Sequence, residues 1–166
     1  KGVGAKAVEA LIAERERKGR FKSFFDFCSR VDSALINRRI LEQLIKSGAF
    51  DWCDHSRAQL LLALDDILKR TQQQREEAAS NQMGLFGGKS AGDEESAIFS
   101  KYPANEWASN VRLAHEKEAL GFYLSGHPLE KYRSELARMG ALSVGDLQKS
   151  RDGAEVRLGG VITFLR

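Results

Sequence analysis

The sequence predicts a mainly α-helical chain that ends on a single β-strand. Three observations indicate this fold class: apolar residues recur at helical spacing through residues 5–68, a glycine-rich polar stretch interrupts the pattern at residues 80–97, and apolar residues alternate from 156 to 164. Spacings of three and four residues align side chains on one helix face, whereas alternation aligns them on one face of a strand. We therefore expect a helical domain, a loop, further helices and the start of a β domain.

Four helices are expected before the glycine-rich stretch. Their apolar faces lie within residues 5–18, 24–31, 37–47 and 56–68. Asn37 is suited to cap the third helix, because its side-chain oxygen accepts a hydrogen bond from an unpaired N–H group of the first turn. Ser56 and Gln59 have the spacing of a capping box, which predicts that the fourth helix begins there.

The second half of the chain alternates helices with stop signals. A helix is expected from about Asn105 to Leu124, another after Pro128, and a short one capped by Ser143. The alternation at residues 156–164 predicts a strand, and a lone strand has no hydrogen-bonded partner. The chain is therefore expected to be a piece of a longer protein that ends inside a β domain.

Composition argues against several classes of protein. No uninterrupted apolar stretch is long enough to span a membrane, and the N-terminus lacks the order of a signal peptide, so a cytoplasmic protein is expected. No histidine lies at zinc-ligand spacing from Cys28 or Cys53, and Cys28 sits in an apolar helical phase that predicts burial. The carboxylates, the histidines and the possible nucleophiles do not show the spacing of a catalytic site. We expect neither a metal site nor an active site in this chain.

Basic residues are concentrated at the N-terminal end of the chain. Residues 1–50 contain 11 Lys or Arg against 6 Asp or Glu, whereas residues 51–110 contain 6 against 10. An excess of this size is only weak evidence for binding to a polyanion such as nucleic acid. The alternative is that these basic residues simply form a solvated surface.

The turn Gly2-Val3-Gly4, the first hairpin, stands directly before the first expected helix, with Lys1 and Lys6 beside it. Backbone N–H groups at a helix N-terminus, together with the helix dipole, suit a phosphate. Val3 is expected to anchor the turn in the core. The pattern Gly-Val-Gly-x-x-Ala resembles the helix-hairpin-helix motif, which grips the DNA backbone without reading sequence. The alternative is a simple helix cap.

A second hairpin is expected at residues 47–50, between the third and fourth helices. Gly48 would make the turn, and basic residues of the third helix would add charge. Two such turns in the basic part of the chain favour contact with the backbone of double-stranded DNA, independent of base sequence. The candidate phosphate-binding residues are Lys1, Gly2, Val3, Gly4, Lys6, Arg38, Arg39, Lys46 and Gly48.

Residues 82–86 read Gln-Met-Gly-Leu-Phe within the glycine-rich stretch. Burying Leu85 and Phe86 would contribute about 1.5–3 kcal/mol each, against an ordering cost of about 1–2 kcal/mol per residue. This balance suits weak, reversible docking to a partner; the alternative is that both side chains pack onto their own domain. The spacing Gln-x-x-Leu-Phe resembles the bacterial sliding-clamp-binding peptide, which implies Gln82, Met83, Leu85 and Phe86 as clamp-binding residues.

Taken in order, these segments resemble a region of the C-family replicative DNA polymerases. That region is the C-terminal half of the alpha subunit of bacterial DNA polymerase III. The resemblance spans almost the whole chain, which makes it more specific than any one motif. The matching stretches are residues 1–4, 21–27, 37–51, 57–60, 82–86 and 116–129, the last reading Glu-Lys-Glu-Ala-Leu-Gly-Phe-Tyr-Leu-Ser-Gly-His-Pro-Leu.

The resemblance implies a non-catalytic module, because the family's catalytic aspartates and their magnesium lie in a palm domain upstream. It implies binding to double-stranded DNA, the sliding clamp and other polymerase III subunits, in the bacterial cytoplasm and at the nucleoid during replication. The implied parts are a tandem helix-hairpin-helix domain lacking its first helix (1–79), a flexible loop with the clamp-binding peptide (80–98), a helical connector (99–142) and the start of a truncated OB-fold (143–166).

Two other functions stay open on the residues alone. A helix-hairpin-helix module of a DNA repair nuclease or ligase would share the Gly-Val-Gly turn but not the Gln-Met-Gly-Leu-Phe segment. A helical protein-interaction module would have no role on DNA. Binding to a sliding clamp separates the replicase from both alternatives, and salt-dependent duplex binding separates the two DNA-binding modules from the third.

Overall fold

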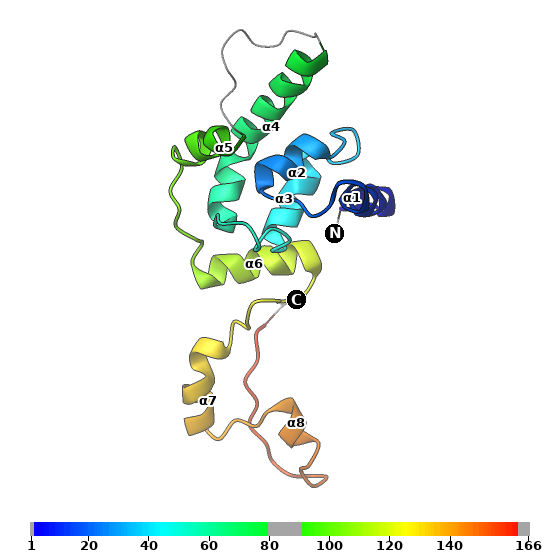
Figure 1. Cartoon of the computed structure of the whole chain (residues 1–166). Helices are drawn as coiled ribbons and strands as arrows, with labels where there is room; N and C mark the ends of the chain where they lie inside the picture. The colour runs from blue at the N-terminus through cyan, green and yellow to red at the C-terminus, as the bar shows by residue number, and fades with distance from the viewer. Residues whose placement is uncertain (1, 80–90, 163–166) are drawn as a thin grey trace. The chain divides into compact units, whose positions relative to one another are not determined.

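The computed structural model describes residues 2–79 and 91–162 of the chain, which divides into two compact units, Lys1–Phe122 and Tyr123–Arg166 (Figure 1). Regular structure among the described residues is helical, apart from one isolated β-bridge. Within these residues, no helix is both long enough and apolar enough to cross a membrane.

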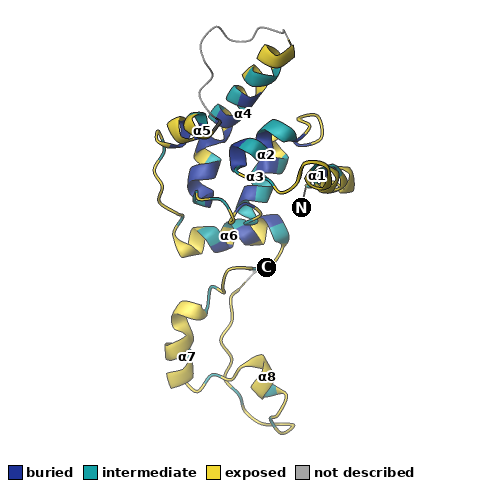
Figure 2. Cartoon of the chain, in the orientation of Figure 1, coloured by how far each residue is buried: buried dark blue, intermediate teal, exposed yellow. Residues whose placement is uncertain are grey.

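All four helices expected before the glycine-rich stretch are present in the first unit, and two more follow. The long helix α4 packs against α2, α3 and α5, while α6 packs against α3. Burial is therefore concentrated where α2, α3 and α4 meet (Figure 2). The six helices are α1 (Ala5–Lys18), α2 (Phe24–Arg30), α3 (Arg38–Lys46), α4 (Arg57–Ala79), α5 (Ala91–Phe99) and α6 (Ser109–Leu120).

An aromatic cluster forms the centre of this core. Phe50 meets Phe24 and Phe27 edge-to-face, with ring centroids 4.8 and 4.9 Å apart. Each fully buried Phe contributes about 1.5–3 kcal/mol, and each edge-to-face pair adds about 0.5–1.5 kcal/mol. Cys28 is buried beside these rings, as its helical phase predicted.

Short polar side chains begin the helices as predicted. The Asn37 side chain accepts a hydrogen bond from Ile40 N at 3.1 Å, and Ser56 Oγ accepts one from Gln59 N at 3.1 Å. The Gln59 side chain does not complete the capping box. Instead, its Nε2 donates to the backbone carbonyls of Phe99 and Tyr102, both at 3.1 Å, and so ties α4 to the end of α5.

Other helix ends are capped by side chains from distant helices. The Glu95 carboxylate accepts a hydrogen bond from Phe25 N, in the first turn of α2, at 3.2 Å. The Arg75 guanidinium donates to the carbonyls of Cys28 and Val31, at the other end of α2, at 2.8 and 2.7 Å. Because unpaired N–H and C=O groups at helix ends are costly to bury, these bonds stabilise the packing of α2 against α4 and α5.

The expected loop over residues 80–98 is corrected from residue 91 onward, where the chain forms α5. Asp93 and Glu94 lie in the first turn of this helix, where negative charge is favourable, and Ile98 and Phe99 are buried in the core. The glycine content of the stretch concealed this amphipathic end. Residues 80–90 lie outside the described residues.

The next helix, α6, is shorter than the expected span of 105–124. It begins at Ser109 and ends at Leu120, because Gly121 adopts a left-handed φ of 90° and its N–H bonds the carbonyl of Lys117 at 3.0 Å. The proposed helical connector of residues 99–142 is thus divided between the two units.

The second unit consists of short elements: a 3₁₀ turn (Glu130–Tyr132), α7 (Arg133–Arg138) and α8 (Val144–Leu147). Ser143 caps α8 as predicted, accepting a hydrogen bond from Asp146 N at 3.1 Å. The expected strand is not confirmed: up to residue 162, the described chain forms one parallel bridge between Ala141 and Arg157. A strand needs a neighbour to pair with, and a single bridge does not make a ladder.

Candidate nucleic-acid interface

The first hairpin leads directly into α1. Gly2 has a φ of 81°, a left-handed conformation that glycine adopts without steric cost. Gly4 is the N-cap of α1 and offers no side chain to the first turn, and no capping side-chain bond is present among the described residues. Val3 packs against the core, as predicted, and anchors the turn. The arrangement presents backbone N–H groups at a helix N-terminus, the geometry that suits a phosphate.

Two of the predicted basic residues are available near this turn. The first hairpin lies against α3, since a Cβ on Gly2 would be 3.9 Å from Cγ of Gln43. Arg39 lies one helical turn before Gln43, on the same side of α3. Lys6 and Arg39 are both exposed, and neither forms an ion pair within residues 2–79 and 91–162. Lys1 lies outside the described residues.

Two other predicted basic residues are paired with carboxylates. Arg38 Nε lies 2.6 Å from Oδ1 of Asp65, and the same guanidinium also contacts Glu42. Lys46 Nζ lies 3.0 Å from Oε2 of Glu118. The hydrogen bond from Arg38 lowers the pKa of Asp65, and the bond from Lys46 lowers the pKa of Glu118. Both cations are therefore partly neutralised before any phosphate arrives.

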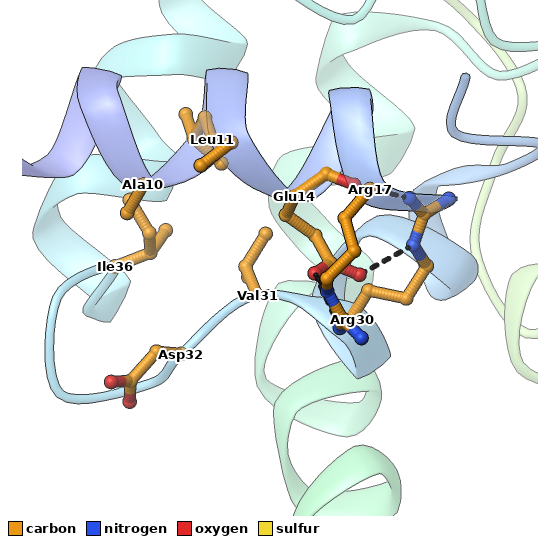
Figure 3. A pocket seen from close by; sticks show the side chains of 9 residues that line it. Ala10, Leu11, Glu14, Arg17, Arg30, Val31, Asp32 and Ile36 are labelled. Carbon is orange, nitrogen blue, oxygen red and sulfur yellow. Dashed lines mark hydrogen bonds and ion pairs between the residues drawn. The ribbon is translucent and has the colours of Figure 1, made fainter. Parts of the chain in front are cut away.

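Part of the N-terminal basic excess serves the fold instead. A cavity of about 220 Å³ lies beside α1. Figure 3 shows the side chains that line it, with Glu14 between the guanidinium groups of Arg17 and Arg30. Its carboxylate is 2.6 Å from Nη2 of Arg17 and 3.1 Å from Nε of Arg30, and the Arg17 hydrogen bond is the main cause of a lowered Glu14 pKa. Arg30 also donates to the carbonyl of Gly19 at 3.0 Å, at the C-terminal end of α1. Because Glu14 and Asp32 also line this cavity, it does not suit an anion.

The turn of the second hairpin closes a helix end. Gly48 has a φ of 82°, and its N–H donates to the carbonyl of Ile45 at 3.0 Å. The N–H of Ala49 donates to the carbonyl of Leu44 at 3.0 Å. These bonds satisfy the last carbonyls of α3, so the turn acts as a helix C-cap and the N–H groups of Gly48 and Ala49 are already used.

A buried arginine fills the space beside Gly48. A Cβ at that position would lie 2.8 Å from Cζ of Arg57, so a side chain there would have to displace the guanidinium. Arg57 Nε donates to Asp51 at 2.7 Å, and its Nη1 donates to the fully buried Glu116 of α6 at 2.8 Å. The bond to Asp51 is the main cause of a raised Arg57 pKa, which keeps this group charged. The network joins the second hairpin, α4 and α6.

A distant carboxylate caps the N-terminus of α4. Glu106 Oε2 accepts a hydrogen bond from Arg57 N at 3.0 Å, and its Oε1 accepts one from Ala58 N at 3.2 Å. Oε1 also accepts a bond from Trp107 N at 2.7 Å. The N-terminal N–H groups that a phosphate would need at the second hairpin are therefore bonded within the chain.

Sequence reasoning missed Arg57, Glu106 and Glu116 as members of this site. Glu106 and Glu116 lie 49 and 59 positions from Arg57, so no local spacing links them. The predicted clamp-binding residues, Gln82, Met83, Leu85 and Phe86, lie outside the described residues. Within the described ranges, no group of three or more His, Cys, Asp or Glu side chains is arranged to hold a metal ion.

Comparison with known proteins agrees with the predicted helix-hairpin-helix motif. Residues 1–60 match the model of a helix-hairpin-helix motif. The whole chain is 42% identical to DNA polymerase III subunit alpha of Pasteurella multocida, and 37% and 34% identical to the subunits of that name from Escherichia coli K12 and Vibrio cholerae. The chain spans 14% of the length of each of these relatives.

Proposed function

Because the whole chain matches a region of DNA polymerase III subunit alpha, we propose that it is a non-catalytic part of a bacterial replicative polymerase that binds the backbone of double-stranded DNA. The observation that carries this proposal is the first hairpin. There, Gly4 begins α1 without a capping side chain, inside the segment that matches the helix-hairpin-helix motif.

Phosphate binding at the first hairpin combines two contributions. The N–H groups of the first turn of α1 donate to phosphate oxygens, and the positive end of the helix dipole favours their charge. Lys6 of α1 and Arg39 of α3 add exposed positive charge. None of these groups reads a base edge, so affinity is independent of DNA sequence and falls steeply with salt.

Titration of fluorescent duplexes with the whole chain over a range of salt concentrations tests this proposal. Lys6→Glu and Arg39→Glu should each weaken binding equally on unrelated sequences. Each should also reduce the slope of log affinity against log salt by about 0.9 for every phosphate that is no longer neutralised. Lys69→Glu, on exposed α4 surface, changes the net charge equally and should have a smaller effect. A roughly 100-fold preference for one sequence would contradict backbone binding.

Sliding-clamp binding by residues 82–86 is a second part of the proposal, supported by the sequence Gln-Met-Gly-Leu-Phe and by the match to the polymerase subunit. Leu85 and Phe86 would enter an apolar pocket of the clamp, and Gln82 would set the register by hydrogen bonding. The cost of ordering the segment limits the dissociation constant to about micromolar.

Titration of a bacterial sliding clamp with the wild-type chain and with Leu85→Ala/Phe86→Ala tests the clamp contact. The double variant should lose binding and keep its melting temperature and duplex affinity. Equal clamp affinity for the two proteins would disprove the contact. A large loss of melting temperature would instead assign both side chains to the core.

Catalysis is proposed to lie outside this region, in the longer polymerase, together with the magnesium that its chemistry uses. The chain would then act with other polymerase III subunits in the bacterial cytoplasm, at the nucleoid during replication. Incubation with primed DNA, nucleotides and magnesium should give neither extension nor degradation. Template-dependent extension that is lost on replacing a carboxylate of this chain would overturn the assignment.

A further inference from the structure

The two hairpins differ in what covers the helix that follows them. At the first hairpin, Gly4 leaves the start of α1 without a capping side chain. At the second, both oxygens of the Glu106 carboxylate bond the N–H groups of Arg57 and Ala58, the first two residues of α4. A carboxylate and a phosphate bind a helix N-terminus through the same N–H groups and the same dipole.

Two further bonds hold the Glu106 carboxylate in this position. Ser56 Oγ donates to the carbonyl of Asn105 at 3.2 Å, and Trp107 N donates to Glu106 Oε1 at 2.7 Å. An acceptor tethered within its own chain has an effective concentration of about millimolar or more. A DNA phosphate would have to displace it and would then lie beside the displaced negative charge.

The charges around the second hairpin also oppose a phosphate. Two of its cations are already paired with carboxylates, Arg57 with Asp51 and Glu116, and Lys46 with Glu118.

We propose that Glu106 is an internal substitute for a DNA phosphate at the second hairpin, so that, of the two hairpins, only the first contacts duplex DNA. The second hairpin then serves the fold, joining α3, α4 and α6. This inference rests on the proposed duplex binding and names the part of the surface that performs it.

The test measures duplex affinity against salt concentration for the whole chain and its variants. Glu106→Ala removes the carboxylate and frees the N–H groups of α4, so the salt slope should steepen by about 0.9, the value for one more neutralised phosphate. Glu106→Gln also removes the charge but keeps one of the two acceptor oxygens, so it still covers part of the helix start and its slope should steepen less than that of Glu106→Ala. Thermal unfolding identifies any variant that fails to fold.

A neutral pair of substitutions provides the matched control. Lys46→Gln with Glu118→Gln keeps the net charge and should leave affinity and slope within about twofold of wild type, the scale of a weak surface pair. Lys6→Gln should reduce the slope by about 0.9. The inference is overturned if the Lys46 and Glu118 pair lowers the slope as much as Lys6→Gln does, or if Glu106→Ala, folded, keeps the wild-type slope. Absence of duplex binding by the wild type would instead contradict the proposed function itself.

Discussion

Gly48 and Gly121 both have a positive φ at the end of a helix but differ in their surroundings. Their φ angles are 82° and 90°, in the region where other residues are strained. A Cβ on Gly121 would meet nothing within 4 Å, whereas one on Gly48 would meet the guanidinium of Arg57 and the carboxylate of Asp51. The preference for glycine at position 48 therefore has two causes, the positive φ and the lack of space, and only the positive φ is shared with Gly121.

Replacing each of these glycines with alanine separates the two causes. Gly121→Ala should lower the free energy of unfolding by about 1–2 kcal/mol, the cost of a left-handed conformation for a residue with a side chain. Gly48→Ala should lower it by about 1–3 kcal/mol more, because the new methyl displaces Arg57 from its partners. Urea unfolding monitored by circular dichroism measures both. Equal losses for the two variants would show that Arg57 moves aside without cost.

At the scale of elements, the Arg57 network links α4 to α6. Arg57 is only 4% exposed and Glu116 is fully buried at 0%. Burying such a pair is costly, and the pair stabilises the fold only while each charge keeps its partner. The orientation of α6, and of Glu106 just before it, therefore depends on this contact.

Arg57→Met should lower the free energy of unfolding by about 3–5 kcal/mol, because it removes a partner from the buried Glu116 carboxylate. Lys101→Met, which breaks the exposed pair with Asp66, should cost less than about 1 kcal/mol. Chemical denaturation of the two variants provides the comparison. Similar small losses in both would mean that water or rearranged side chains compensate Glu116.

The two units of the whole molecule differ in how much they bury. The first unit holds the entire buried core, whereas no described residue of the second unit is buried (Figure 2). Apolar side chains such as Val144 and Ile162 are 74% and 78% exposed there. A region with few buried apolar contacts opens at low free energy. The second unit is thus the less stable part of the chain.

Limited trypsin digestion should cut the second unit first. Cleavage after residues such as Arg133, Arg138, Lys149 and Arg151 should precede cleavage within α2, α3 or α4, because local opening exposes them more often. Mass spectrometry of early products reads the order of cleavage. Early cuts in α3 or α4 would contradict the difference in stability between the units.

The charge pairs of the molecule also predict sensitivity to acid. Among the described residues, hydrogen bonds lower the pKa of five carboxylates. Cations are the main donors to Glu14, Asp65, Asp66 and Glu118, whereas Ser143 is the main donor to Asp146. A carboxylate whose pKa is lower in the folded state stabilises the fold at pH values above its unfolded-state pKa, about 4. This contribution is lost as the pH falls through the folded-state pKa.

The melting temperature should therefore fall as the pH drops below about 4.5 and change little just above it. Glu118→Gln removes one of the titrating groups and should make this fall slightly smaller, since each exposed pair contributes little. Scanning calorimetry from pH 7 to pH 3 measures both proteins. A melting temperature that rises on acidification would contradict the direction of these pKa shifts.

Local sequence determined the helices before the glycine-rich stretch, their caps at Asn37 and Ser56, the turn at Gly2 and the burial of Cys28. Each depends on residues within about one helical turn, where spacing and side-chain chemistry act directly. The same local rules mistook the start of α5 for loop, because the burial of Ile98 and Phe99 depends on helices distant in sequence.

Only the tertiary structure decided which cations remain available and which helix N-terminus is open. Arg38 and Arg39 are neighbours in sequence, yet Arg38 pairs with Asp65 on α4 while Arg39 is exposed without an ion pair among the described residues. Glu106 reaches the start of α4 from 49 positions away. Charge pairing and helix capping act over a few ångströms in space, whatever the separation along the chain. The sequence therefore revealed which groups can bind an anion, but not which of them a carboxylate of the same chain already binds.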